Sequence, residues 1–158
     1  MKTAEEWIEQ LDLTPHPEGG YYREVERSGK SFGQTDENRP QYTTIYFLLT
    51  SENPSRFHQL TSDEIWFFHD GSPLTVHTIS PAGEYTPNKL GFDSKLQFKV
   101  PAGDIFGSSV ENGYALVSCM VVPGFEFSDF KLFTQDELLN RYPEHRDIIK
   151  FLAYESLD

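Results

Sequence analysis

The sequence of 158 residues contains a single cysteine, few basic residues and no long apolar run. The lone Cys119 excludes an intramolecular disulfide and a zinc module built from several cysteines. The longest apolar runs, 45–49 and 119–122, are far shorter than the roughly 20 residues that a membrane-spanning helix needs. The sequence therefore predicts a globular protein without a membrane partner.

Basic residues are outnumbered by acidic ones, 13 to 25, which gives a net charge of −12 at pH 7. A surface of this sign repels polyanions, so we expect no nucleic acid partner and no binding to an acidic membrane. The first ten residues carry acids where a signal peptide has a basic and then an apolar region. We therefore expect a cytoplasmic protein.

Turn residues divide most of the chain into short segments with the composition of β-strands. The T-x-x-E pattern of Thr3 and Glu6 predicts an N-terminal helix within residues 1–14, and Thr134 and Glu137 predict a helical tail over 134–154. Between them, residues 21–132 predict an antiparallel sandwich or barrel within a single domain, 1–158. Its expected strands are 21–25, 42–49, 57–61, 64–69, 74–80, 96–100 and 114–122. The polar stretch 26–41 is typical of a surface loop.

The segment 57–71 contains the side chains best suited to chemistry. His58 and Glu64 lie on consecutive predicted strands, and a hairpin between these strands would bring the imidazole and the carboxylate together on one face. Such a pair could hold a metal, transfer a proton or form a buried hydrogen bond that sets the strand register.

Several stretches resemble a known family. Glu64 and Gly71, separated by six residues, resemble the end of the first cupin motif, and Pro101-Ala102-Gly103 resembles the P-x-G turn of the second. Over residues 7–142 the chain resembles the small stand-alone cupins often called cupin-5, most clearly at 16–24, 45–49, 62–66 and 122–127. This resemblance implies an all-β cupin jelly roll (a double-stranded β-helix) and a homodimer.

The resemblance also implies where a metal would bind. Metal-binding cupins supply two histidines and a glutamate from the first motif and a third histidine from the second. His58 and Glu64 occupy two of these positions, but Leu60 and Phe106 stand at the other two. Because zinc and iron sites usually recruit three or four protein ligands, we expect no cofactor. A divalent transition metal held by His58 and Glu64 is the less favoured alternative.

Three functions remain open at this point. The favoured one is binding of a small molecule in the barrel interior, with Arg23 as an anchor for an anionic group. The second is a metal-independent isomerase or epimerase acting on a sugar or sugar nucleotide, with His58 as base, Glu64 tuning it and Tyr46 as acid. The third is a metal-dependent dioxygenase or isomerase. The predicted ligand-binding residues are Arg23, Tyr46, His58, Glu64, Trp66, Gln97 and Phe106.

Each of these residues also has a purely structural interpretation. The aromatic side chains would belong to the core, Arg23 to a surface ion pair, and Gln97 to the outward half of a strand alternation. His16, beside Pro17, is more typical of a turn, and Cys119 of an apolar strand interior.

Overall fold

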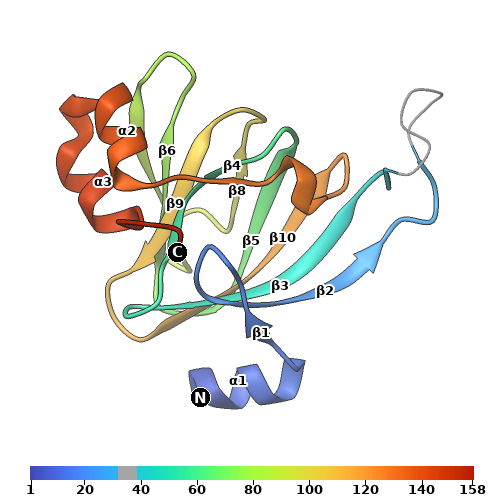
Figure 1. Cartoon of the computed structure of the whole chain (residues 1–158). Coiled ribbons are helices and arrows are strands. Elements are labelled where there is room, and N and C mark those ends of the chain that lie inside the picture. The colour runs from blue at the N-terminus through green and yellow to red at the C-terminus, as the bar shows by residue number, and fades with distance from the viewer. Residues whose placement is uncertain (32–38) are drawn as a thin grey trace.

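Two antiparallel sheets face each other in the computed structural model, which describes residues 1–31 and 39–158 (Figure 1). Within these residues the larger sheet has six strands, in the order β1 (Thr14–Pro15), β2 (Tyr21–Arg27), β3 (Thr43–Thr50), β10 (Tyr114–Val122), β5 (Asp63–Gly71) and β8 (Gln97–Val100). The smaller described sheet has five, in the order β11 (Lys131–Leu132), β4 (Ser55–Gln59), β9 (Ile105–Val110), β6 (Leu74–Ile79) and β7 (Tyr85–Leu90).

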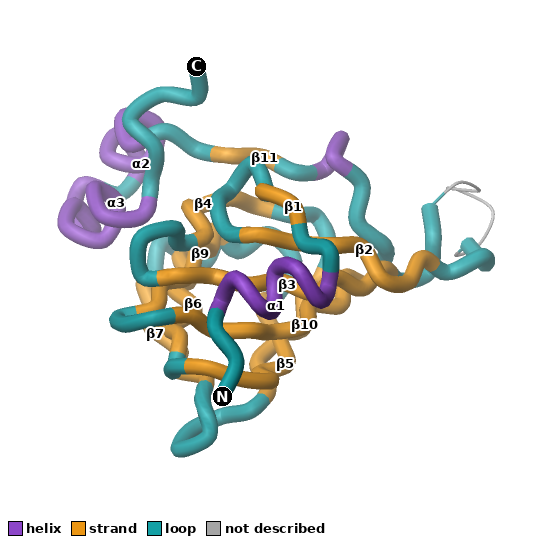
Figure 2. The backbone as a smooth tube through the Cα atoms, turned by 90° about the horizontal axis from the view of Figure 1, so that it is seen from below, coloured by secondary structure: helices purple, strands orange, loops and turns teal. Residues whose placement is uncertain are grey.

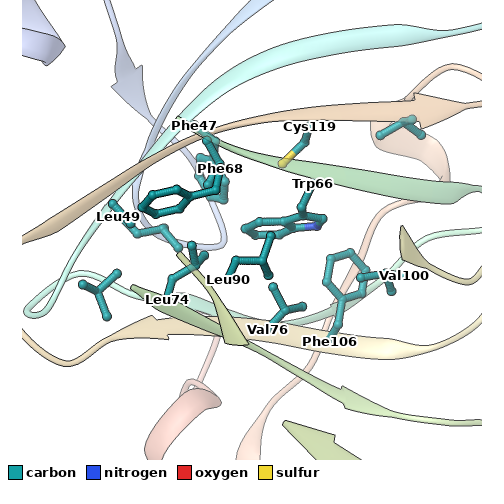
Figure 3. Packing of buried hydrophobic residues seen from close by; sticks show 14 of the residues in the cluster. Phe47, Leu49, Trp66, Phe68, Leu74, Val76, Leu90, Val100, Phe106 and Cys119 are labelled. Carbon is teal, nitrogen blue, oxygen red and sulfur yellow. The ribbon is translucent and has the colours of Figure 1, made fainter. Parts of the chain in front are cut away.

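The main hydrophobic core fills the space between the two sheets. Alternation along β3 turns Phe47 and Leu49 inward, where they meet Trp66 of β5 and side chains of the opposite sheet (Figure 3). Trp66 is fully buried in the middle of this cluster. The core thus occupies one part of the barrel, and a polar cavity occupies the end beyond it.

Helices cover the outer faces of both sheets. Helix α1 (Ala4–Leu11) begins at a capping box formed by Thr3 and Glu6, and it packs across β3 against Leu48 and Leu116 (Figure 2). Helices α2 (Gln135–Arg141) and α3 (Arg146–Leu152) close a second cluster over β4, β6 and β9 (Figure 1). Short 3-10 turns precede each of them, η1 (Phe127–Asp129) and η2 (Pro143–His145). None of the helices in the described residues is long and apolar enough to cross a membrane.

The predicted all-β jelly roll with short terminal helices is confirmed, but four of the described strands were not expected: the two-residue β1 and β11, and the longer β7 and β9. Strand β7 contains Pro87 and several polar residues, and it is tolerated because it lies at a sheet edge. Strand β9 contains Gly107, where an added Cβ would lie 2.7 Å from the carbonyl oxygen of Ser55 on β4. Glycine is therefore required at position 107 because the two backbones approach closely there, although glycine has no side chain that favours a strand. Of the predicted loop 26–41, the start belongs to β2, and residues 32–38 lie outside the described residues.

Candidate functional site

A cavity of about 350 Å³ opens at one end of the barrel. Strands β1, β2, β3, β5 and β10 form one wall, and β4 with the segment after β10 forms the other. Its inner end carries polar side chains, its walls carry aromatic rings, and its mouth carries charges. This volume lies in the range of sites that hold small molecules.

Four titratable side chains meet at the inner end of the cavity: His16, Glu18, His58 and Glu64. The carboxyl group of Glu18 lies between the two histidines, with one oxygen 3.3 Å from Nδ1 of His16 and the other 3.3 Å from Nε2 of His58. The hydroxyl of Ser55 also donates a hydrogen bond to Glu18. The carboxyl group of Glu64, from β5, contacts the thiol of Cys119 on β10.

The turn that carries His16 and Glu18 is shaped by two glycines. Gly19 and Gly20 have φ angles of 112° and 72°, in the region that favours glycine. A Cβ at Gly19 would lie 2.0 Å from the carbonyl oxygen of Pro54, so only glycine lets this turn approach the start of β4. The backbone amide of Arg56 then donates to the carbonyl of Glu18 at 2.7 Å. These contacts place Glu18 beside His58.

The two histidines are neutral because they are buried. Burial lowers the pKa of His58 to about 3 and that of His16 to about 4. Nδ1 of His58 lies 2.7 Å from the carbonyl oxygen of Arg56, which can only accept, so this nitrogen carries the proton. The unprotonated Nε2 therefore faces Glu18. Nδ1 of His16 accepts from the amide of Glu18 at 3.2 Å.

The two carboxyl groups are shifted in the opposite direction. Burial and the charge of Glu64 raise the pKa of Glu18 well above its usual value, and burial raises the pKa of Glu64 to about 7. A protonated Glu18 is the partner that Nε2 of His58 requires. Burial likewise raises the pKa of the Cys119 thiol well above 9, so this cysteine is not a thiolate nucleophile.

Aromatic and charged residues form the outer part of the cavity. The rings of Phe125 and Phe127 meet edge to face, with centroids 4.9 Å apart, and the ring of Tyr22 lies 4.4 Å from that of His16. At the mouth, Arg27 donates to Glu24 at 2.7 Å and to Glu126 at 3.0 Å. This arginine ties β2 to the segment that carries the phenylalanines.

The structure places three of the predicted site residues at this cavity: Arg23, His58 and Glu64. His58 and Glu64 are 2% and 6% exposed, whereas the side chain of Arg23 is 55% exposed at the mouth, 3.9 Å from Asp12. The expected hairpin is wrong, because β4 and β5 belong to different sheets. His58 and Glu64 therefore approach from opposite walls, and the described partner of His58 is Glu18.

Four other predicted residues lie outside the cavity. Tyr46 points to the outer face of its sheet and packs beneath α1, because Phe47 takes the inward position beside it. Trp66 and Phe106 are buried in the core, although the ring of Phe106 contacts His58 with centroids 4.1 Å apart. Gln97 is exposed on the edge strand β8. The proximity of Tyr46 to His58 that an acid–base pair needs is absent.

The sequence did not predict most of the residues that line the wall of the cavity. The missed residues include His16, Glu18, Tyr22, Phe125, Phe127 and Phe130. All but Phe130 fall within the stretches 16–24 and 122–127 that carry the cupin resemblance. The resemblance in these stretches could have pointed to the site. Because they lie far from His58 in the chain, however, the sequence did not predict that they line one cavity with it.

The two facing antiparallel sheets, with a polar cavity at one end of the barrel, define a protein of the cupin superfamily. The chain belongs to the family described as "Cupin superfamily (DUF985)", whose model matches residues 5–133. An uncharacterised protein of Saccharomyces cerevisiae, YML079W, is 33% identical over 176 residues, which cover 96% of this chain and 86% of the yeast protein.

Solved structures support the same assignment. A hypothetical protein from Leishmania major is 46% identical with a TM-score of 0.91, and the match covers 98% of this chain and all of that one. Protein SO0799 of Shewanella oneidensis is 45% identical with a TM-score of 0.93, covering 99% of this chain and all of that one. Oxalate decarboxylase of Bacillus subtilis shares the fold at 13% identity and a TM-score of 0.58, with 92% of this chain matching 38% of that one.

The donor set does not fit the transition-metal centre of many cupins. Leu60 lines the cavity where a second histidine would stand, and Phe106 packs on His58 where a third would stand. Residues 1–31 and 39–158 contain no group of three or more His, Cys, Asp or Glu side chains arranged to hold a metal ion. These described residues therefore lack the three or four ligands that zinc and iron sites usually recruit.

Proposed function

We propose that this cupin binds a small molecule in the cavity between His58, Glu64 and the aromatic wall. The observation that carries the proposal is the cavity itself, about 350 Å³, with a buried polar inner end and aromatic rings along its wall. A barrel that served only as a scaffold would fill this space with its own side chains, as it does around Trp66. Cytoplasmic location and the absence of a tightly bound metal remain predictions.

The isomerase alternative receives less support from the geometry. A general base works best when its pKa lies near the working pH, and burial lowers the pKa of His58 to about 3. Tyr46, the expected acid, lies on the outer face of its sheet. Tyr22 is the tyrosine of the cavity, and it contacts His16 rather than His58.

A fragment screen tests the binding function. We expect ligand-observed NMR with a library of polar, ring-containing fragments to find binders of the wild type. Ile45→Trp fills the cavity from β3 and should weaken them at least tenfold. Phe127→Ala removes a half-exposed ring of the wall and should weaken them by about 2- to 10-fold, since an aromatic contact contributes about 0.5–1.5 kcal/mol.

Phe151→Ala is the matched control, because Phe151 is similarly exposed on α3 and lies away from the cavity. If the fragments bind the two alanine variants and Ile45→Trp with the same affinity as the wild type, the cavity is not a ligand site. Native mass spectrometry of the fresh protein adds a direct measurement of any organic molecule or metal retained from the cell.

A further inference from the structure

The inner end of the cavity holds two buried carboxyl groups and no cationic side chain among the described residues. Glu18 interacts with Ser55 and with two histidines that burial keeps neutral. Glu64 is 6% exposed, and its Oε2 has no hydrogen-bond partner within the described part of the chain. An unpartnered buried acceptor is costly, and a donor that enters the cavity beside Glu64 would remove this cost.

The charges at the mouth do not supply that donor. Of the two arginines that line the described cavity, Arg27 is engaged by Glu24 and Glu126, and Arg23 lies beside Asp12. The acidic lining residues outnumber these arginines; they are Asp12, Glu18, Glu24, Glu64 and Glu126. The negative lining, in a protein of net charge −12, attracts cations into the cavity and repels anions.

The aromatic wall favours the same kind of ligand. Phe125, Phe127 and Phe130 surround the outer cavity, with ring centroids 4.9–6.1 Å apart, and Tyr22 closes the side next to His16. The faces of such rings attract cations and give an apolar body a large contact area. Carboxyl groups at the inner end and rings around the wall form a cage suited to an amine.

Building on the small-molecule function proposed above, we infer that the ligand is an organic cation. It carries a primary or secondary ammonium group, whose N–H donates to the free oxygen of Glu64, and its apolar body lies among Tyr22, Phe125, Phe127 and Phe130. Glu18 stays protonated as the partner of His58, so Glu64 carries the negative charge at the inner end. This assignment gives Glu64 a countercharge that the described residues do not supply, and gives its Oε2 a hydrogen bond.

The inference predicts a link between binding and pH. Glu64 faces the thiol of Cys119 on β10 and the carboxyl of Glu18 on the β1–β2 turn, and the neighbouring His16 and His58 stay neutral near pH 7. An ammonium prefers the ionised form of Glu64, whose pKa lies at about 7. Amine affinity should therefore rise about fivefold or more from pH 6 to pH 8, where a simple amine stays protonated.

Three probes of nearly equal shape and different charge test the inference: 2-phenylethylamine, 2-phenylethanol and phenylacetate. We expect calorimetry and ligand-observed NMR at pH 8 and low salt to show the amine binding at least tenfold more tightly than the alcohol. Phenylacetate should bind most weakly. Glu64→Gln keeps the shape of the side chain and should reduce only the amine affinity, about tenfold. Glu111→Gln, at an exposed position, is the matched control.

The outcomes separate this inference from the proposed function. If the alcohol or phenylacetate binds as tightly as the amine, and Ile45→Trp abolishes that binding, the cavity is a ligand site but the ligand is not a cation. If no probe binds and the fragment screen also fails, both proposals fall. Should Glu64→Gln not fold, the pH series on the wild type decides, because an amine affinity as flat with pH as that of the alcohol overturns the inference.

Discussion

Folding raises the pKa of Glu64, and this shift makes the stability of the protein depend on pH. Its pKa is raised from 4.5 to about 7 by burial, so the folded state binds its proton more tightly than the unfolded state does. The stability that Glu64 contributes is therefore complete below pH 4.5 and is lost as the pH rises through 7. We expect Glu64→Gln, which resembles the protonated form, to gain roughly 2–3 kcal/mol over the wild type between pH 5 and pH 8.

Denaturant unfolding of both proteins at each pH measures this gain. The difference between variant and wild type is the quantity to follow, because His16 and His58 act in the opposite direction. Their pKa values are lowered from 6.5, so the stability they contribute is lost as the pH falls below 6.5. A stability difference that stays constant from pH 5 to pH 8 would contradict the assignment of a raised pKa to Glu64.

Among the elements, the segment 123–130 decides how the cavity is closed. Its polar attachments to the barrel include Arg27, which pairs with Glu126 and donates to the carbonyl of Phe125, and Arg39, which pairs with Asp129 and donates to the carbonyl of Gly124. The amide of Phe125 also donates to the hydroxyl of Thr43 at 2.9 Å. Arg27→Met removes both contacts of Arg27 with this segment and keeps a long apolar stem. We expect faster hydrogen exchange at residues 124–130 and weaker ligand binding, with unchanged exchange in α2 and α3.

The effect of Arg27→Met on global stability should stay within about 1 kcal/mol, because the ion pairs of Arg27 are partly exposed to solvent. Lys131→Met is a suitable control, since it removes an exposed ion pair with Glu137 away from the cavity mouth. Unchanged exchange in the segment would mean that its other attachments, including Arg39 with Asp129, hold it in place without Arg27.

At the scale of the whole molecule, the open edge of the larger sheet bears on assembly. In the described residues, β1 pairs only with Tyr21 and Tyr22, which leaves the rest of β2 without an outer strand. Val25, 43% exposed, lies at a bulge in this edge. Unpaired edges invite pairing with another chain. We expect light scattering to give about twice the chain mass of 18.2 kDa, in line with the homodimer that the resemblance implies.

Val25→Lys should shift this equilibrium toward the monomer by at least tenfold in dissociation constant, because it places a charge at the proposed contact. Phe92→Lys provides the comparison, since Phe92 is also exposed but lies beside Phe68 near the opposite edge of the sheet. A dimer that is disrupted by Phe92→Lys and not by Val25→Lys would move the interface to β8, and a monomer at all concentrations would contradict the dimer.

The local features of the chain could be read from the sequence because their causes are local. Capping residues begin α1 and α2, and the alternation on β3 and β10 predicts strands. The family resemblance further predicted that the strands form a barrel and that His58 and Glu64 lie near one site. The net charge predicts that no polyanion is a partner, and this prediction needs no knowledge of the fold.

The tertiary structure alone decided which side chains meet at that site. Strands β4 and β5 follow each other in the chain but join different sheets, so His58 faces Glu18, 40 residues earlier, instead of pairing across a hairpin with Glu64. Strand pairing and the position of α1 likewise decide that the side chain of Tyr46 points outward and that of Tyr22 points into the cavity. Sheet pairing is a long-range interaction, and its partners are set by how the whole barrel closes rather than by neighbouring residues.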